Sequence, residues 1–177
     1  EYWHQVIKIN DYQKNRFANR IVTELNGTVN NKIITLLGWA FKKDTNDSRE
    51  SASIDIANYL LNEGATINIY DPLVSNELIY KDLSSLLMSN GLDDDKVNSI
   101  IKRVNVFDNV NQAIKNSFCI AILTEWDEFK SLDWGKISKD VEPPMFIADG
   151  RNIVDQKSLD QHTYKYISIG NPIVKKQ

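Results

Sequence analysis

Short apolar runs alternate with amphipathic segments along most of this chain. The runs are bounded by turn residues, which predicts β-strands at 32–37, 66–70, 103–107, 118–123, 145–148 and 164–169. Helical spacing of apolar residues between these runs predicts helices at 48–64, about 76–87, about 93–102 and about 110–114. The alternation indicates an α/β fold, a Rossmann-like three-layer sandwich whose mostly parallel sheet has about six strands.

A long amphipathic helix is predicted before the first strand, over residues 2–25. Its apolar positions are Trp3, Val6, Ile7, Phe17, Ile21, Val22 and Leu25. Gly27 follows, where a left-handed helix cap is usual. The helix either packs wholly on its own sheet or extends its N-terminal half over a neighbouring domain. The chain begins with Glu1 inside this helix rather than with Met, so we expect a piece of a longer protein.

The helix after the first strand is predicted to begin near Ser48 and to end at Gly64. Asp47 and Ser48 are both favourable N-cap residues. Asp47 together with Glu50 also resembles a capping box.

Ligands of parallel α/β sheets bind beyond the carboxyl ends of the strands. In this chain those ends are 38–43, Asp71, 124–126 and 149–151. A diphosphate there would meet Lys42, Arg151 and free backbone N–H groups, a favourable environment for an anion. The alternative is that the cations of this edge form surface ion pairs with Asp44, Asp47, Glu50 and Asp149.

The turn after the first strand lacks the dinucleotide fingerprint G-x-G-x-x-G. Gly38 is followed by Trp39 and Phe41, whose side chains would keep a pyrophosphate off the turn. The sheet therefore carries no Rossmann cofactor site of its own. Asp71 stands where an NAD-binding unit would hold a ribose, but without the glycines a turn aspartate before Pro72 is favoured.

Several single residues leave two interpretations open. Phe41 could stack on a base or pack in the core, and Trp126 could line a cleft, although we favour the core. Cys119 lies inside an apolar strand, which favours a buried thiol over a nucleophile. His4 and His162 have no evident partners and are interpreted as surface or packing residues. No Ser/His/Asp set, metal-ligand spacing or P-loop occurs, so the residues support a phosphate-ligand binding module.

Composition narrows the classes of partner. The 177 residues can bury one core, and a net charge of −3 argues against a nucleic-acid partner. No apolar run approaches the roughly 18 residues of a membrane span, so no membrane association is expected. The lone cysteine and the lack of a signal-peptide pattern favour a cytoplasmic location.

The run from Gly38 to Ser51, GWAFKKDTNDSRES, closely resembles the signature that opens the C-terminal domain of the UDP-glucose 6-dehydrogenase family. Residues 3–17 are similar to the end of that family's long interdomain helix. Motifs that agree in order and spacing are Glu63-Gly64-Ala65, Tyr70-Asp71-Pro72, Thr124-Glu125-Trp126-Asp127 and Asp149-Gly150-Arg151. The resemblance implies that residues 1–27 end the interdomain helix and that 28–177 form the UDP-sugar-binding domain.

The resemblance also implies a reaction. Members of the family oxidise UDP-glucose to UDP-glucuronate in two NAD-linked steps on a catalytic cysteine that has no counterpart here; Cys119 does not take that role. We expect this chain to bind UDP or UDP-glucose, to lack catalytic residues and to be inactive alone. NAD would be bound mainly by a missing N-terminal domain, and the parent enzyme would be a homodimer or larger. A related GDP-mannose or UDP-amino-sugar dehydrogenase is the second hypothesis, and a non-catalytic α/β binding module is the third.

Four residues receive roles from the resemblance, position by position. Phe41 and Lys42 match the family's UDP-glucose contacts in the signature. Arg49 matches an arginine that reaches NAD across the domain cleft. Arg151 lies in the segment that supplies another nucleotide-binding arginine, and we assign the contact to it rather than to Asn152, where animal members often have a second arginine.

Overall fold

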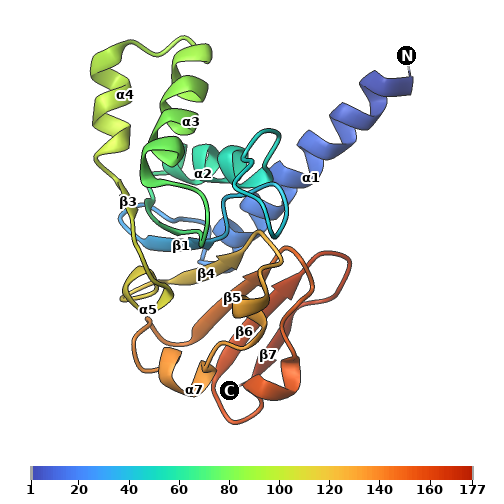
Figure 1. Cartoon of the computed structure of the whole chain (residues 1–177). Helices are drawn as coiled ribbons and strands as arrows, with labels where there is room; N and C mark the ends of the chain where they lie inside the picture. Colours follow the sequence, from blue (N-terminus) through green and yellow to red (C-terminus); the bar gives the residue numbers. More distant parts are fainter. Residues whose placement is uncertain (1, 177) are drawn as a thin grey trace.

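The computed structural model describes residues 2–176, with side chains from Lys8 onward. Its strands form one sheet in the order β3-β2-β1-β4-β5-β6-β7 (Figure 1). The strands span β1 Ile33–Leu37, β2 Thr66–Tyr70, β3 Val104–Val106, β4 Cys119–Ile122, β5 Met145–Asp149, β6 Tyr164–Ser168 and β7 Val174–Lys176. All neighbouring strands pair in parallel except β6 and β7. The predicted mostly parallel α/β sheet is confirmed.

The sheet contains one strand more than predicted. β7 pairs antiparallel with β6, and Val174 lies opposite Tyr166. Val174 is partly buried, whereas Lys175 and Lys176 are exposed, so the segment has no apolar run. Because an edge strand this short is stabilised by its partner rather than by its own composition, its sequence gives no strand signal.

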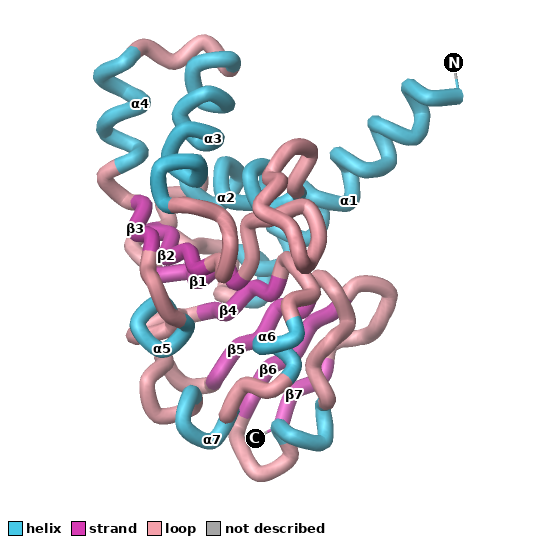
Figure 2. Tube along the Cα trace, in the orientation of Figure 1, coloured by secondary structure: helices cyan, strands magenta, loops and turns pink. Residues whose placement is uncertain are grey.

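Helices cover both faces of the sheet, as a three-layer sandwich requires. They span α1 Tyr2–Glu24, α2 Ala52–Asn62, α3 Asn76–Ser89, α4 Asp94–Ile101, α5 Val110–Ala113, α6 Asp127–Lys130, α7 Trp134–Ile137 and the 3₁₀ helix η1 Gln156–Leu159. Figure 2 shows α1, α2 and α3 grouped on one side, with the short helices α5, α6 and α7 on the other. The core lies between these layers and β1 and β4, which are buried on both faces as continuous apolar strands require.

Helix α1 has the predicted bounds to within one residue. Phe17, Ile21 and Val22 are buried in the core, and Gly27 after the helix has a φ of +77°. Tyr12 is 64% exposed, and the N-terminal half of the helix projects away from the sheet (Figure 1). The side chains of Trp3, His4, Val6 and Ile7 lie outside the described residues, and a covering role for this half stays a prediction.

The predicted start of α2 is wrong. Ser51 is the N-cap, and its side chain accepts a hydrogen bond from the backbone N–H of Ser53. Glu50 has a φ of +61°, a left-handed conformation that a helix cannot contain. Asp47 instead accepts hydrogen bonds from the backbone and the guanidinium of Arg49. The apparent capping box at Asp47 and Glu50 is therefore part of a loop.

Candidate functional site

Residues Gly38 to Ser51, here called the signature loop, lie at the carboxyl edge of the sheet between β1 and α2. Gly38 has a φ of +100°, and any Cβ there would collide with the side chain of Thr124. The loop therefore crosses directly over the end of β4, and only glycine allows this close approach. Ser53, in the first turn of α2, donates a hydrogen bond of 2.9 Å to the carbonyl of Gly38.

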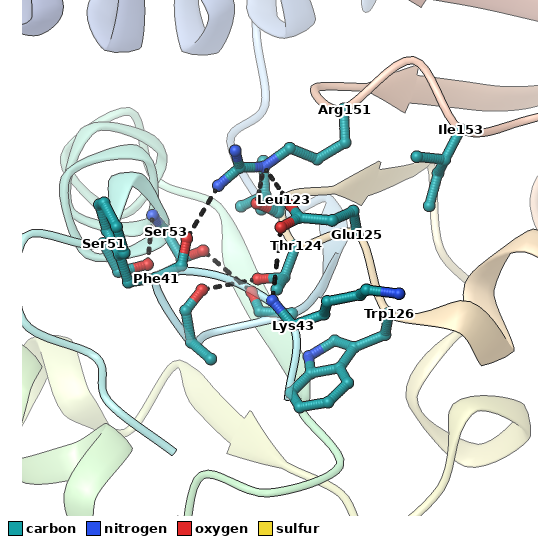
Figure 3. Close-up of polar contacts among 12 residues, drawn as sticks. Phe41, Lys43, Ser51, Ser53, Leu123, Thr124, Glu125, Trp126, Arg151 and Ile153 are labelled. Carbon is teal, nitrogen blue, oxygen red and sulfur yellow. Dashed lines mark hydrogen bonds and ion pairs between the residues drawn. The ribbon is translucent and has the colours of Figure 1, made fainter. Parts of the chain in front are cut away.

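Two residues after β4, Thr124 and Glu125, hold the signature loop from the neighbouring strand (Figure 3), and Trp126, which follows them, contacts Asp71. Thr124 Oγ1 donates to the carbonyl of Ala40 over 2.8 Å. Glu125 Oε1 accepts from the backbone N–H of Lys43 over 3.4 Å. Trp126 is buried and its Nε1 donates to Asp71 Oδ2 over 3.1 Å. The preference for a core position of Trp126 is confirmed.

Asp71, at the end of β2, holds the same loop from the other side. Its Oδ2 accepts from the backbone N–H groups of Trp39 at 2.6 Å and Ala40 at 2.9 Å. Its Oδ1 accepts from the backbone N–H groups of Leu73 and Val74 in the turn that follows β2. The interpretation as a turn aspartate is confirmed, and both carboxylate oxygens are engaged within the protein.

These contacts correct the expectation of free backbone N–H groups at the loop. The N–H groups of Trp39 and Ala40 bind Asp71, and that of Phe41 donates to the carbonyl of Asp47 over 2.8 Å. Among residues 39–43, within the described chain, the N–H of Lys42 is the one without a protein partner. Since the first amides after β1 are occupied, the turn does not fit the pyrophosphate of a dinucleotide.

A second buried carboxylate organises the turn after β5. Asp149 is fully buried, and its Oδ1 accepts from the backbone N–H of Arg151 over 3.0 Å. Its Oδ2 accepts from the backbone N–H groups of Ile153 and Val154 and from the hydroxyl of Tyr166. Asp149 therefore places the backbone of Arg151 at the sheet edge and does not form the surface ion pair considered from the sequence.

The side chain of Arg151 reaches across the strand ends to the signature loop (Figure 3). Its Nε donates to the carbonyl of Leu123 over 2.7 Å, and its Nη2 donates to the carbonyl of Phe41 over 3.2 Å. Glu125 Oε2 lies 3.3 Å from Nε and forms an ion pair with it. Arg151 thus joins the turn after β5 to the residue that the sequence placed in the substrate site.

Phe41 and Arg151 line one cavity of about 340 Å³ between the signature loop and α1. Phe17, Ile56 and Leu123 contribute apolar side chains to its walls. The remaining lining residues are Asn10, Asp11, Gln13, Lys14, Glu50, Ala52, Gly150 and Ile169. The Phe41 side chain is 49% exposed, so of the two alternatives left open for it the core position is wrong. A stacking contact with a base stays a prediction.

Lys42 and Arg49 are not among the residues that line this cavity. Lys42 is exposed, and within the described residues its Nζ has no hydrogen bond or ion pair. Arg49 pairs with Asp47 over 2.7 Å, with its own side chain 87% exposed. The hydrogen bonds from Arg49 lower the pKa of Asp47 to about 2. The surface-pair alternative therefore holds for Arg49 and not for Lys42.

Glu125 is the residue of this region to which the sequence gave no role. It is the third residue after the buried strand β4 and lies at the same edge as Arg151, which is the signal that could have identified it. Lys43 pairs with Asp127 over 3.1 Å, a partner that the sequence did not indicate.

Elsewhere, Cys119 is 1% exposed and burial raises the pKa of its thiol, so the interpretation as a buried, unreactive cysteine is supported. Across residues 2–176 no helix is long and apolar enough to cross a bilayer. Within the same described part of the chain no three His, Cys, Asp or Glu side chains gather in a way that could hold a metal ion.

Solved structures with the same fold include two sugar-nucleotide dehydrogenases. NDP-N-acetyl-D-galactosaminuronic acid dehydrogenase from Methanosarcina mazei Go1 superposes with a TM-score of 0.71 at 24% identity, covering 97% of this chain and 32% of that one. A UDP-glucose dehydrogenase from Pyrobaculum islandicum gives 0.60 at 23% identity, covering 86% and 29%. At sequence identities this low, the structural similarity establishes only that the folds are the same.

Sequence comparison is more specific. UDP-glucose 6-dehydrogenase 4 of Arabidopsis thaliana is 47% identical over 176 residues, which cover 98% of this chain and 37% of that protein. UDP-glucose 6-dehydrogenase 1 of Glycine max is 46% identical over 180 residues, with the same coverage. The chain thus spans little more than a third of the length of these relatives.

Residues 35–156 match the UDP-glucose/GDP-mannose dehydrogenase family, UDP binding domain. The signature loop, the turn after β5 and these matches together show that the chain belongs to the UDP-glucose/GDP-mannose dehydrogenase family and carries its UDP-binding domain.

Proposed function

We propose that this chain binds the UDP part of UDP-glucose and serves as the UDP-binding portion of an NAD-dependent UDP-glucose 6-dehydrogenase. The observation that carries the proposal is the cavity in which Phe41 and Arg151, joined by a hydrogen bond, face the same space. Relatives that are 44–47% identical over almost the whole chain and named UDP-glucose 6-dehydrogenases support this substrate.

The two side chains offer complementary contacts to a nucleotide. Phe41 presents a half-exposed apolar ring, which suits stacking or packing against a base or sugar. The guanidinium of Arg151 has five N–H donors, and its protein contacts use Nε and one donor of Nη2. The remaining donors suit the oxygens of a diphosphate or of a ribose.

Lys42 supplies a further positive charge at the rim of this site. It directly follows Phe41, and its Nζ has no competing carboxylate among the described residues. Lys43 and Arg49 are already paired with Asp127 and Asp47. We therefore assign the contact with the diphosphate or the sugar to Lys42, which acts as a flexible point charge.

NAD, when bound to the parent enzyme, supplies the hydride acceptor for two successive oxidations that convert UDP-glucose to UDP-glucuronate. The turn after β1 does not fit the dinucleotide, so we place NAD mainly on another domain of the parent enzyme, together with the catalytic residues. From this chain Arg49 would reach the cofactor, since its side chain is exposed and directed to solvent apart from its pair with Asp47. We propose a cytoplasmic parent enzyme that is a homodimer or larger.

Calorimetric titration of the chain with UDP tests the proposal. Lys42→Ala and Arg151→Ala should each weaken binding by about tenfold, because each removes one charge-assisted contact. Lys115→Ala is the matched control, since Lys115 is exposed and lies before β4, at the opposite edge of the sheet. UDP binding that both site variants leave unchanged contradicts the assigned residues.

The same titration separates the alternatives. GDP that binds as tightly as UDP favours a GDP-mannose dehydrogenase, and stronger competition by a UDP-amino sugar than by UDP-glucose favours a dehydrogenase of that class. Failure of every nucleotide to bind favours a non-catalytic α/β module.

A further inference from the structure

We propose that Glu125 is a positioning residue of the UDP site, which fixes the guanidinium of Arg151 relative to the signature loop. This inference rests on the proposed function, because it concerns how the same site is kept ready for its ligand. Glu125 is not among the residues that line the cavity, so it acts through Arg151 and not by touching the nucleotide.

The geometry places Glu125 between the two segments that form the site (Figure 3). Its Oε2 lies 3.3 Å from Nε of Arg151, in the turn after β5. Its Oε1 accepts the backbone hydrogen bond of Lys43 over 3.4 Å, in the signature loop. One carboxylate from a third segment, the end of β4, therefore contacts both walls.

Because it is buried, the Glu125 carboxylate depends on Arg151 as its counter-charge. Oε2 of Glu125 is buried and, in the described part of the chain, accepts no hydrogen bond. A buried carboxylate oxygen without a hydrogen bond is costly unless a counter-charge lies close to it. The guanidinium of Arg151 is that counter-charge, so the two side chains hold each other in place.

The orientation of Arg151 follows from three contacts on one side of its planar group. Nε faces the carbonyl of Leu123 and the carboxylate of Glu125, and Nη2 faces the carbonyl of Phe41. Nη1 takes part in none of these contacts. A guanidinium that is fixed before the ligand arrives loses less rotamer entropy on binding, which strengthens the complex.

Glu125→Gln tests this role with little change of shape. Its amide oxygen can keep the bond to Lys43, but its NH₂ group would face the Nε–H donor of Arg151 and displace the guanidinium. UDP affinity, measured by calorimetry, should fall by about fivefold, which is the usual effect of losing one such hydrogen bond. In an Arg151→Ala background the same substitution should change affinity by less than about twofold, because its effect passes through Arg151.

A readout without ligand accompanies the titration. The side-chain Nε–H signal of Arg151 in the nuclear magnetic resonance spectrum should be resolved and slow to exchange with water in the unaltered chain. Glu125→Gln should shift this signal and speed its exchange. Glu142→Gln is the matched control, because Glu142 is exposed and precedes β5, at the opposite edge of the sheet, and it should leave the signal and the affinity unchanged.

The outcomes separate the two proposals. An Arg151 signal that Glu125→Gln leaves unchanged overturns the positioning role whether or not UDP binds. A rise in UDP affinity also overturns it, since that result means the carboxylate only repels the diphosphate. Equal losses with and without Arg151 overturn it by showing a general structural effect. If the unaltered chain does not bind UDP, the proposed function is wrong. The Nε–H signal of Arg151 then still tests whether Glu125 contacts Arg151.

Discussion

Buried carboxylates at the ends of β2 and β5 control the shape of the site at the scale of single residues. Asp71 and Asp149 each accept several hydrogen bonds, most of them from backbone N–H groups in the loops that follow or adjoin their strands. Each carboxylate thereby replaces the water that these amides would otherwise bind. The loops that carry Phe41 and Arg151 are consequently held by side chains that themselves stay out of the cavity.

Asp71→Asn should destabilise the fold by about 2–4 kcal/mol, because the amide group cannot accept the bonds that one carboxylate oxygen now receives. The free energy of unfolding from urea titration measures this loss. Asp160→Asn, at an exposed residue that pairs with Lys176, should stay within about 0.5 kcal/mol of the unaltered chain. Equal effects of the two substitutions would refute the role given to Asp71.

The raised pKa of Tyr166 predicts that the folded protein loses stability at alkaline pH. Burial, together with the neighbouring Asp149 carboxylate, raises the pKa of Tyr166 from 10.0 to about 12. The folded state therefore keeps a proton that the unfolded chain releases, so stability is complete below pH 10 and falls as pH rises through 10 toward about 12.

Urea titrations of the chain between pH 8 and pH 11.5 should show this decline, and Tyr166→Phe should reduce its slope. Part of the slope should remain, since burial also raises the pKa of Tyr70 and Tyr164. An unchanged slope in Tyr166→Phe would assign the alkaline loss to other groups.

Helix α2 shows how local signals compete at the scale of an element. The sequence favoured caps at Asp47 and Ser48, whereas the structure uses Ser51. The left-handed conformation of Glu50 ends the loop at that point, while Asp47 is engaged by Arg49. A helix start is thus decided by the path of the preceding loop as well as by cap preference.

Ser51→Ala should lower the free energy of unfolding by about 1 kcal/mol, the usual weight of a serine N-cap. Asp47→Ala should cost clearly less than Ser51→Ala, since it removes exposed hydrogen bonds with the backbone and side chain of Arg49. Thermal or urea unfolding of both variants measures the difference. A larger loss for Asp47→Ala than for Ser51→Ala would show that Asp47, not Ser51, acts as the cap of α2.

The whole molecule is built around a central pair of strands, β1 and β4, that is buried on both faces. Cys119 lies in β4 and is 1% exposed, so its thiol reports on opening of the entire sheet. Burial also raises the pKa of this thiol, which reduces the thiolate available for reaction.

A thiol reagent such as Ellman's reagent should therefore modify Cys119 slowly in the folded chain and completely in denaturant, at a rate that follows unfolding. Ser89→Cys, at an exposed residue near the end of α3, should add one thiol that reacts at once. Rapid labelling of the unaltered folded chain would show that β4 opens without global unfolding.

Periodic and local patterns allowed the sequence by itself to determine six strands in their order along the chain, the alternating helices, the buried Cys119 and the edge where the candidate site lies. Each of these depends on neighbours a few residues away, so short stretches of sequence encode them. The tertiary structure decided which donors and charges remain free at that edge. Asp71 accepts hydrogen bonds from backbone N–H groups 31 and 32 residues away in the sequence. Arg151 donates a hydrogen bond to the carbonyl of Phe41, 110 residues away. Such partners, like the pairing of β7 with β6, meet only after the strands have assembled, because nothing local in the sequence specifies them.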